Sequence, residues 1–365
     1  MSNPPDPADR ASEQHQTLTA RESARAVARA TAHDVAARAG VSQPTVSLVL
    51  SGNPKARVSA ETRARVVRAA EELGYRPNAL AQGLVRRRSF ALGVVVPDLE
   101  NPFFAAVVSG AEKVAARAGY AVFLCEAGET PAEQHLEALR ARQIDGVILD
   151  AVGAAALGGG EGRLGGMQVV LVDELLADYP AVVSDAEQAG ELAAHHLLSL
   201  GHRRLAFIGP ALDTSAFRLR ERGFTRTLRG AAAPLTSERL RRAGATVIGG
   251  MQAMRALLAL RPRPTGVFCA NDLAAVGALK ACALARVAVP HELSIVGCDD
   301  IELARLVTPE LTTVAIPSRE LGARAARLLI RRLAGDEGEG ATRPMRPLPV
   351  RLVPRGTTAA APEAA

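Results

Sequence analysis

The chain has 365 residues, of which 48% are hydrophobic and 22% charged, and its formal net charge is +6 at pH 7. Such a length exceeds one compact domain, and no apolar run approaches the roughly 20 residues that a membrane-spanning helix needs. The first 30 residues lack the basic start and apolar stretch of an export signal. We therefore expect a soluble, cytoplasmic protein of two or three domains, preceded by a disordered extension over residues 1–30.

The positive charge is concentrated near the amino terminus. Residues 31–88 hold ten Lys and Arg residues and four acidic ones, a difference equal to the net charge of the whole chain. Lys and Arg side chains that meet phosphates release counterions, and this release provides most of the nonspecific affinity of proteins for DNA. A solvated basic surface would have the same composition, so the charge alone leaves both interpretations open.

Three short helices are predicted within this basic segment. The first begins at Thr31, whose hydroxyl can cap it, and ends at Gly40. The second begins at Ser42, and the third runs from Ser59 to near Gly74. The expected buried faces consist of Val35 and Ala39, then Val46, Val49 and Leu50, then Val66, Val67, Ala70 and Leu73. Two helices around a glycine turn, supported by a third, can place the second helix in the major groove, although Ala-rich three-helix units without a DNA role have the same periodicity.

The same segment resembles a known family of regulators. Residues 31–52, 58–63 and 73–81 are similar to the head of the lactose-repressor (LacI/GalR) family, and the similarity continues to about residue 333. The resemblance implies a helix-turn-helix DNA-binding domain over residues 31–77, whose second helix contacts the bases of an operator half-site. The implied contact residues are Ser42, Gln43, Pro44, Thr45, Ser47 and Leu48. Leu48 departs from the Arg of many members, and leucine offers a base only an apolar contact, such as one to a thymine methyl.

Residues 78–89 resemble the hinge helix and linker of that family, a helix that is ordered only when the dimer is on its operator. The resemblance implies DNA contacts for Asn78 and Arg86, and it matches Leu84 to the leucine that wedges into a central base step. Such an apolar wedge unstacks bases and bends the duplex, while a nearby arginine can meet a phosphate. A core leucine is the alternative for Leu84, which the adjacent glycine and basic run disfavour.

From residue 90 onward, short β-branched segments alternate with longer Ala- and Leu-rich segments. This alternation is typical of parallel sheets covered by helices, and a single sheet would be too large, so we expect two lobes. The resemblance implies the same: an α/β body of two Rossmann-like lobes, like the type I periplasmic sugar-binding proteins, over residues 90–358. The residues that follow, 359–365, are expected to form a flexible tail. The predicted strands are residues 91–96, 121–125, 146–149, 169–172, 205–208, 266–270 and 293–297.

Ligands of parallel α/β sheets bind beyond the carboxyl ends of the strands, where this sequence has several polar residues. The segment 218–224 resembles the ligand-binding arginine motif of the family. The effector-binding residues implied by the resemblance are Arg220 and Asp299 as polar partners, Asn271 and Asp272 as nearby hydrogen-bonding groups, and Phe103 and Phe104 as packing surfaces. The alternatives are surface ion pairs for the first pair and ordinary core packing for the two aromatic residues.

Other patterns point weakly to other classes of protein. Residues 160–165 fit the Gly-x-Gly-x-x-Gly dinucleotide pattern, but they precede a predicted strand, whereas that fingerprint follows a strand and opens a helix. His195, His196 and His202 lie on or just after a predicted amphipathic helix, which is no metal-binding arrangement. No nucleophile and base stand in a supporting motif. We therefore expect no enzymatic activity, no cofactor and no metal.

These observations predict a sequence-specific DNA-binding transcriptional regulator, a repressor by resemblance. We expect a homodimer on a pseudo-palindromic double-stranded operator, with a small-molecule effector between the lobes that controls operator affinity. A sugar or related metabolite is the expected effector, although aromatic residues make up only 3% and Trp is absent, whereas sugar sites often stack an aromatic ring on the ligand. The alternative is a periplasmic-type solute receptor with no DNA role, which would need an export signal and no basic head.

Overall fold

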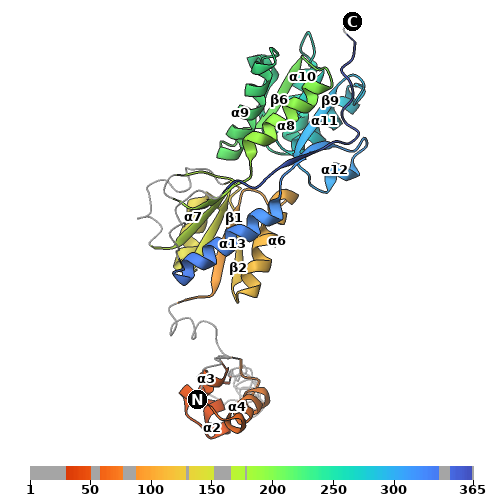
Figure 1. Ribbon diagram of the computed structural model, residues 1–365. Coiled ribbons are helices and arrows are strands. Elements are labelled where there is room, and N and C mark those ends of the chain that lie inside the picture. The colour runs from red at the N-terminus through yellow and green to blue at the C-terminus, as the bar shows by residue number, and fades with distance from the viewer. Residues whose placement is uncertain are drawn as a thin grey trace, which may run out of the picture. The chain divides into compact units, whose positions relative to one another are not determined.

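The computed structural model describes residues 30–50, 58–76, 88–128, 131–151, 166–176, 179–336 and 346–363. Contacts between Cα atoms divide the chain into two compact units, residues 1–87 and residues 88–365 (Figure 1). We call these units the head and the body, and each is described by itself.

The described part of the head contains the three predicted helices, α2 (Ala32–Ala39), α3 (Gln43–Leu50) and α4 (Ala60–Glu72). Thr31 and Asp34 form a capping box at the start of α2, and the Ser59 side chain caps α4. Gly40 ends α2 in the left-handed conformation, with φ 65°, which glycine adopts without strain. The capping and turn signals of the sequence are therefore confirmed at both ends of α2 and at the start of α4.

The head has a small core of its own, built mainly from valine and alanine. Val35, Val46 and Val66, one from each helix, are fully buried. The predicted burial of Val67 and Leu73 is wrong, because these residues are 39% and 38% exposed. Val67 lies about 100° around the helix from its buried neighbour, and Leu73 is the C-cap residue, beyond the last turn of α4.

Each lobe of the body is built around one sheet. The N-lobe sheet has the strand order β2-β1-β3-β4-β5, and its strand pairs are parallel. The C-lobe sheet has the order β11-β10-β9-β8-β6-β7, in which β11 pairs antiparallel with β10 and the other pairs are parallel. The N-lobe elements are β1 (Ala91–Val96), α6 (Pro102–Arg117), β2 (Ala121–Glu126), α7 (Ala132–Ala141), β3 (Gly146–Asp150), β4 (Gln168–Val172), β5 (Ala181–Val182) and α13 (Ser318–Ala334). The C-lobe elements are α8 (Ala186–Ser199), β6 (Leu205–Pro210), α9 (Ser215–Gly230), β7 (Leu240–Ala243), α10 (Val247–Leu258), β8 (Gly266–Cys269), α11 (Asp272–Leu284), β9 (Ser294–Asp299), α12 (Leu303–Leu306), β10 (Thr312–Ala315) and β11 (Arg351–Val353).

All seven predicted strands are present, with ends that differ from the prediction by at most two residues. The sequence patterns do not predict β5, β7, β10 and β11. Each of these strands has four residues or fewer, so the local sequence signal of each is weak. The predicted class, two α/β lobes with mainly parallel sheets, is confirmed.

The chain crosses between the lobes three times. It enters the C-lobe after β5, returns to the N-lobe between β10 and α13, and enters the C-lobe again before β11. Helix α13 packs against α6 and β4, which makes it part of the N-lobe (Figure 1). The first and third crossings lie side by side, because Ser184 and Leu348 form a parallel bridge. Short connecting segments of this kind serve as hinges between lobes.

Residues 359–361 contact the folded C-lobe, which corrects this part of the flexible tail predicted over 359–365. The buried His202 ring donates to the carbonyl oxygen of Ala359, and the backbone N–H of Ala361 donates to the carbonyl oxygen of Leu200 at 2.7 Å. The composition of this segment gives no sign of these contacts, because the segment makes them through its backbone.

Helices α8 and α9 approach each other closely through two glycines. A Cβ atom at Gly190 of α8 would lie 1.9 Å from the carbonyl oxygen of Arg220 in α9, and one at Gly223 of α9 would lie 2.0 Å from the carbonyl oxygen of Glu187. Interiors are packed too densely to absorb such overlaps without movement. The two glycines therefore set the distance between these helices.

Gly190→Ala is expected to destabilise the body, because the added methyl group has to push α9 away from α8. Overpacking of this kind costs about 1–3 kcal/mol, and each kcal/mol lowers the thermal midpoint of a domain of this size by roughly 2–4 °C. The matched control is Gly230→Ala, at an exposed position of α9 with open space around it, which should leave the midpoint unchanged or slightly higher. Equal losses for the two variants in a thermal unfolding experiment would contradict the close-packing role.

Candidate functional site

The outer face of α3 is exposed in the head. Of the six predicted base-contacting residues, Thr45 is half-buried, and the exposed ones are Ser42, Gln43, Pro44, Ser47 and Leu48. The opposite face of α3 buries Val46 and Val49 in the head core. The hydroxyls of Ser42 and Thr45 hydrogen-bond at 2.9 Å. A short helix exposed in this way fits the width of the major groove, and its polar side chains have donors and acceptors for base edges.

The head also exposes basic side chains. Arg65, Arg68 and Arg76 are exposed in the described part of the head, where they are available to phosphates. The predicted hinge contacts Asn78, Leu84 and Arg86 lie outside the described residues.

In the body, the two residues predicted as polar effector partners meet at the carboxyl end of the C-lobe sheet. Arg220, in the second turn of α9, is 3% exposed. Its Nη1 donates to the carbonyl oxygen of Ala270 at 2.6 Å and lies 3.3 Å from Oδ1 of Asp299. Asp299 ends β9 with φ 125°, a region that side-chain-bearing residues rarely adopt and that clusters at functional sites. Because both residues are buried, the alternative of a surface ion pair is wrong.

Two acidic residues of the N-lobe, neither of them predicted, lie at the same junction. Asp150 ends β3 and has no exposed surface. Asp173 follows β4 and accepts hydrogen bonds from the backbone N and the Oγ of Ser184, at 2.6 and 2.9 Å. The positive charge of Arg220, in the other lobe, acts to lower the pKa of both carboxyl groups. The carboxyl ends of the two sheets thus contribute acidic residues around one buried arginine. We call the set of Asp150, Asp173, Arg220 and Asp299 the interlobe junction.

Burial controls the ionisation of the interlobe junction. Burial, reinforced by the negative charges of Asp173 and Asp299, holds the pKa of Asp150 well above its usual range. Burial also raises the pKa of Asp299 well above its usual range, although Arg220 acts in the opposite direction. For Arg220, burial lowers the pKa, but the acidic groups around it, Cys298, Asp299 and Asp173 among them, outweigh burial and raise the pKa. The guanidinium therefore stays charged, and the buried carboxyl groups are weaker acids than exposed ones.

Four buried polar atoms of the interlobe junction have no hydrogen-bond partner among the residues that the structure describes: both oxygens of Asp150, Oδ1 of Asp299 and Nε of Arg220. Buried polar atoms are nearly always paired, and an unpaired one costs about 1–3 kcal/mol. A hydroxyl group donates to a carboxylate and accepts from a guanidinium, so a ligand with neighbouring hydroxyls can satisfy these atoms. The junction therefore has the chemistry of a small-molecule site.

Asn271 and Asp272 are occupied by contacts within the C-lobe. Asn271 caps α11, and its side-chain amide donates to the carbonyl oxygen of Ala245 at 2.9 Å. The oxygens of Asp272 accept from the backbone N of Ile301 at 3.0 Å and from the hydroxyl of Thr313 at 2.6 Å, and burial raises the pKa of Asp272 to about 6. These contacts tie α11 to the ends of β9 and β10. Effector contact by either residue stays a prediction.

Phe103 and Phe104 begin α6, beyond the carboxyl end of β1. Their rings pack edge to face with centroids 5.3 Å apart, and both belong to the largest core cluster. This position fits core packing, the alternative that the sequence left open, and a direct contact with the effector stays a prediction.

The structure also bears on the other patterns noted in the sequence. Within the described ranges, no three His, Cys, Asp or Glu side chains are grouped to hold a metal ion. His202 is fully buried and hydrogen-bonds with the hydroxyls of Thr265 and Ser294, each at 3.0 Å, which is a structural role. The glycine pattern at 160–165 lies outside the described residues. Among the helices that the structure describes, none is long and apolar enough to cross a membrane.

A helix-turn-helix head and a two-lobed α/β body with a buried polar junction define a class, the DNA-binding regulators with a ligand-sensing body. Residues 31–78 match the family model of bacterial regulatory proteins of the lacI family, and residues 194–358 match that of the periplasmic binding protein-like domain. The chain belongs to the LacI family of bacterial transcriptional regulators. It is a DNA-binding transcriptional regulator and not an enzyme.

Individual proteins resemble the chain along most of its length. It is 33% identical to the transcriptional repressor PurR of Mannheimia succiniciproducens over 327 aligned residues. The alignment covers 86% of this chain and 95% of that repressor. The solved Lac repressor dimer, bound to operator and the anti-inducer ONPF, is 28% identical, with a TM-score of 0.79 over 91% of this chain and 99% of that chain. The transcriptional regulator CelR in its cellobiose complex is 30% identical, with a TM-score of 0.67 over 90% of this chain and 100% of that chain. The alternative of a solute receptor without a DNA role is therefore not favoured.

Asp150→Asn is expected to stabilise the ligand-free protein, and more so as the pH rises. Because burial raises the pKa of Asp150 above its ordinary 3.8, the folded body holds a proton that the unfolded chain releases, so stability is lost as the pH rises above that value. A neutral amide does not ionise and removes this loss. Chemical unfolding at pH 5 and pH 8 should therefore show a larger gain at pH 8.

The control for this experiment is Asp336→Asn, which changes an exposed carboxylate just after α13. It should leave the stability nearly unchanged at both pH values. If Asp150→Asn gave the same change at pH 5 and pH 8, Asp150 would not be a buried group with a raised pKa.

Proposed function

We propose that this regulator represses transcription by binding a pseudo-palindromic operator as a homodimer, and that a small molecule bound at the interlobe junction controls its operator affinity. The observation that carries the proposal is that both lobes contribute buried polar atoms without a hydrogen-bond partner among the described residues, from Asp150 in one lobe and from Arg220 and Asp299 in the other. Such atoms are costly unless something pairs with them, and a bound effector pairs with them.

The DNA-binding half of the proposal rests on α3 and on the charge of the head. Exposed Gln43 and Ser47 reach base edges, while Leu48 contacts a thymine methyl. By family resemblance, Asn78 and Arg86 contact the backbone and Leu84 wedges into the central step. Two heads related by a two-fold axis read two half-sites, and the similar Lac repressor was solved as a dimer on its operator. The site of action is the cytoplasm, where the chromosome lies.

The effector class follows from the chemistry of the interlobe junction. Its carboxyl groups accept from hydroxyl donors, and its arginine donates to hydroxyl or ring oxygens. This set suits a polyhydroxylated molecule, a sugar or a related metabolite, and the similar CelR was solved with cellobiose.

Regulation then follows from the difference in effector affinity between two arrangements of the lobes. An effector that holds Asp150 and Arg220 together favours one arrangement, and it shifts operator affinity by the free energy of that preference.

Arg220→Ala is expected to weaken the effector response and to leave operator binding in place. A thermal-shift screen of sugars, nucleosides and related metabolites first identifies a ligand that stabilises the natural protein. Because a hydrogen bond from a charged arginine to the ligand is worth about 1.5–3 kcal/mol, the variant should bind that ligand roughly 10- to 100-fold more weakly by calorimetry. The control is Arg229→Ala, which changes an exposed arginine of the same helix. Equal ligand affinity of the Arg220→Ala variant and the natural protein would contradict a site at this junction.

A further inference from the structure

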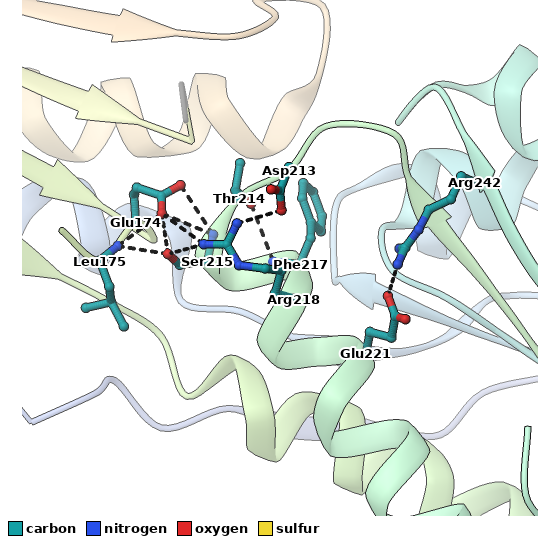
Figure 2. Close-up of polar contacts among 9 residues, drawn as sticks. All are labelled: Glu174, Leu175, Asp213, Thr214, Ser215, Phe217, Arg218, Glu221 and Arg242. Atoms are coloured by element: carbon teal, nitrogen blue, oxygen red, sulfur yellow. Dashed lines mark hydrogen bonds and ion pairs between the residues drawn. The ribbon is translucent and has the colours of Figure 1, made fainter. Parts of the chain in front are cut away.

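Glu174 of the N-lobe contacts the first turn of α9 in the C-lobe. It follows β4, is 2% exposed, and accepts from the backbone N of Ser215 at 3.1 Å through Oε1 and at 3.3 Å through Oε2. The Oγ of Ser215 donates to the same carboxylate and accepts from the backbone N of Leu175 at 3.1 Å. Figure 2 shows these contacts gathered around one serine. The carboxylate therefore joins the lobes at a point outside the three chain crossings.

Arg218 completes the cluster from the solvent side. Its Nη2 donates to the Oγ of Ser215 at 3.1 Å and lies 3.8 Å from Oε1 of Glu174, and its Nη1 donates to Asp213 at 2.6 Å (Figure 2). A buried carboxylate needs such compensation, because removing a charge from water is costly unless it is paired and hydrogen-bonded. Glu174 is therefore held by a positive charge and by the backbone N–H of Ser215 at a helix amino terminus, which also favours negative charge.

The contact is not needed to begin α9. Thr214 is already the N-cap residue, and its hydroxyl accepts from the backbone N of Phe217 at 3.4 Å. A helix that has its own cap gains nothing essential from a second acceptor in another lobe. The contact of Glu174 instead ties the position of α9 to the N-lobe. Because α9 also carries Arg220, the same helix is linked to the N-lobe twice, once at its first turn and once at the interlobe junction.

We propose that Glu174 and Ser215 form an interlobe latch, which stabilises the arrangement of the lobes in which Arg220 faces the acids of the N-lobe. The regulatory meaning of the latch rests on the proposed effector function. The apparent affinity of an effector is proportional to the fraction of molecules in the competent arrangement, so a latch that raises this fraction raises the apparent affinity without touching the ligand.

A second pair in the same region provides the matched control. Glu221 of α9 pairs with Arg242 of β7, and both belong to the C-lobe (Figure 2). Glu221→Ala thus removes a glutamate–arginine contact from the same helix without removing a contact between lobes. If Glu174→Ala changes the distance between the lobes and Glu221→Ala does not, the change results from losing the contact between the lobes.

The latch is tested by measuring the distance between the lobes without effector or DNA. Spin labels are placed at Glu112→Cys on α6 and Lys280→Cys on α11, two exposed positions in different lobes, in a chain whose half-buried Cys125 is changed to Ser. The remaining cysteines, Cys269, Cys282 and Cys298, are buried. The labelled chain is diluted into unlabelled protein, so that electron spin resonance reports distances within one chain.

The natural protein should show one main distance, and Glu174→Ala should add a second one, with the ratio of the two populations changed about tenfold, the change that about 1.4 kcal/mol produces. The isosteric Glu174→Gln, which keeps the volume but not the charge, should shift the ratio less and in the same direction. Glu221→Ala should match the natural protein.

The latch is overturned if neither Glu174 variant changes the distances, or if Glu221→Ala changes them as much. Because the measurement uses no effector, this failure would leave the proposed regulatory site intact, whereas a failed ligand screen would leave the latch intact.

Discussion

A guanidinium group buried between two sheets must have negative partners, and in this protein the partners come from both lobes. Arg220 is 3% exposed, with Asp299 at 3.3 Å in its own lobe and Asp173 acting on it from the other. Separating the lobes would leave the arginine with fewer charges to balance it, and burying a charge without a partner costs several kcal/mol. The arrangement of the lobes is thus tied to the electrostatics of one side chain, and any molecule that competes for those charges acts on the arrangement as well.

Local features of the fold bring this side chain to its place. Gly190 and Gly223 let α9 lie close against α8, and the parallel strands deliver Asp150 and Asp299 at their carboxyl ends. The head depends on none of this, because it has its own core of valine and alanine. DNA recognition therefore lies in the head, and the control of DNA binding lies in the two-lobed body.

The sequence predicted most of the regular structure and half of the junction. Long β-branched runs and capping residues are local signals, so the helices of the head and seven strands were found, whereas strands such as β7, with two arginines in four residues, have no local pattern. Arg220 and Asp299 were identified through resemblance. Asp150 and Asp173 were missed, although each stands at the end of a predicted strand, where the rule about strand ends would have found them.

Contacts between distant segments had no comparable signal. Glu174 and Ser215 are 41 positions apart, and the choice of partner depends on how the two lobes face each other. Likewise, the tail after residue 358 was expected to be free because its composition is bland, yet Ala361 hydrogen-bonds through its backbone. Side-chain patterns do not report such bonds.

The most direct test of the whole account is a selection of random DNA duplexes at physiological salt, with sequencing of those retained by the full chain and by residues 88–365 alone. The full chain should enrich a pseudo-palindromic sequence, because two basic heads read two half-sites, and the isolated body should enrich nothing. The account is contradicted if the full chain retains duplexes without any sequence preference, or if the body selects the same sequence without the head.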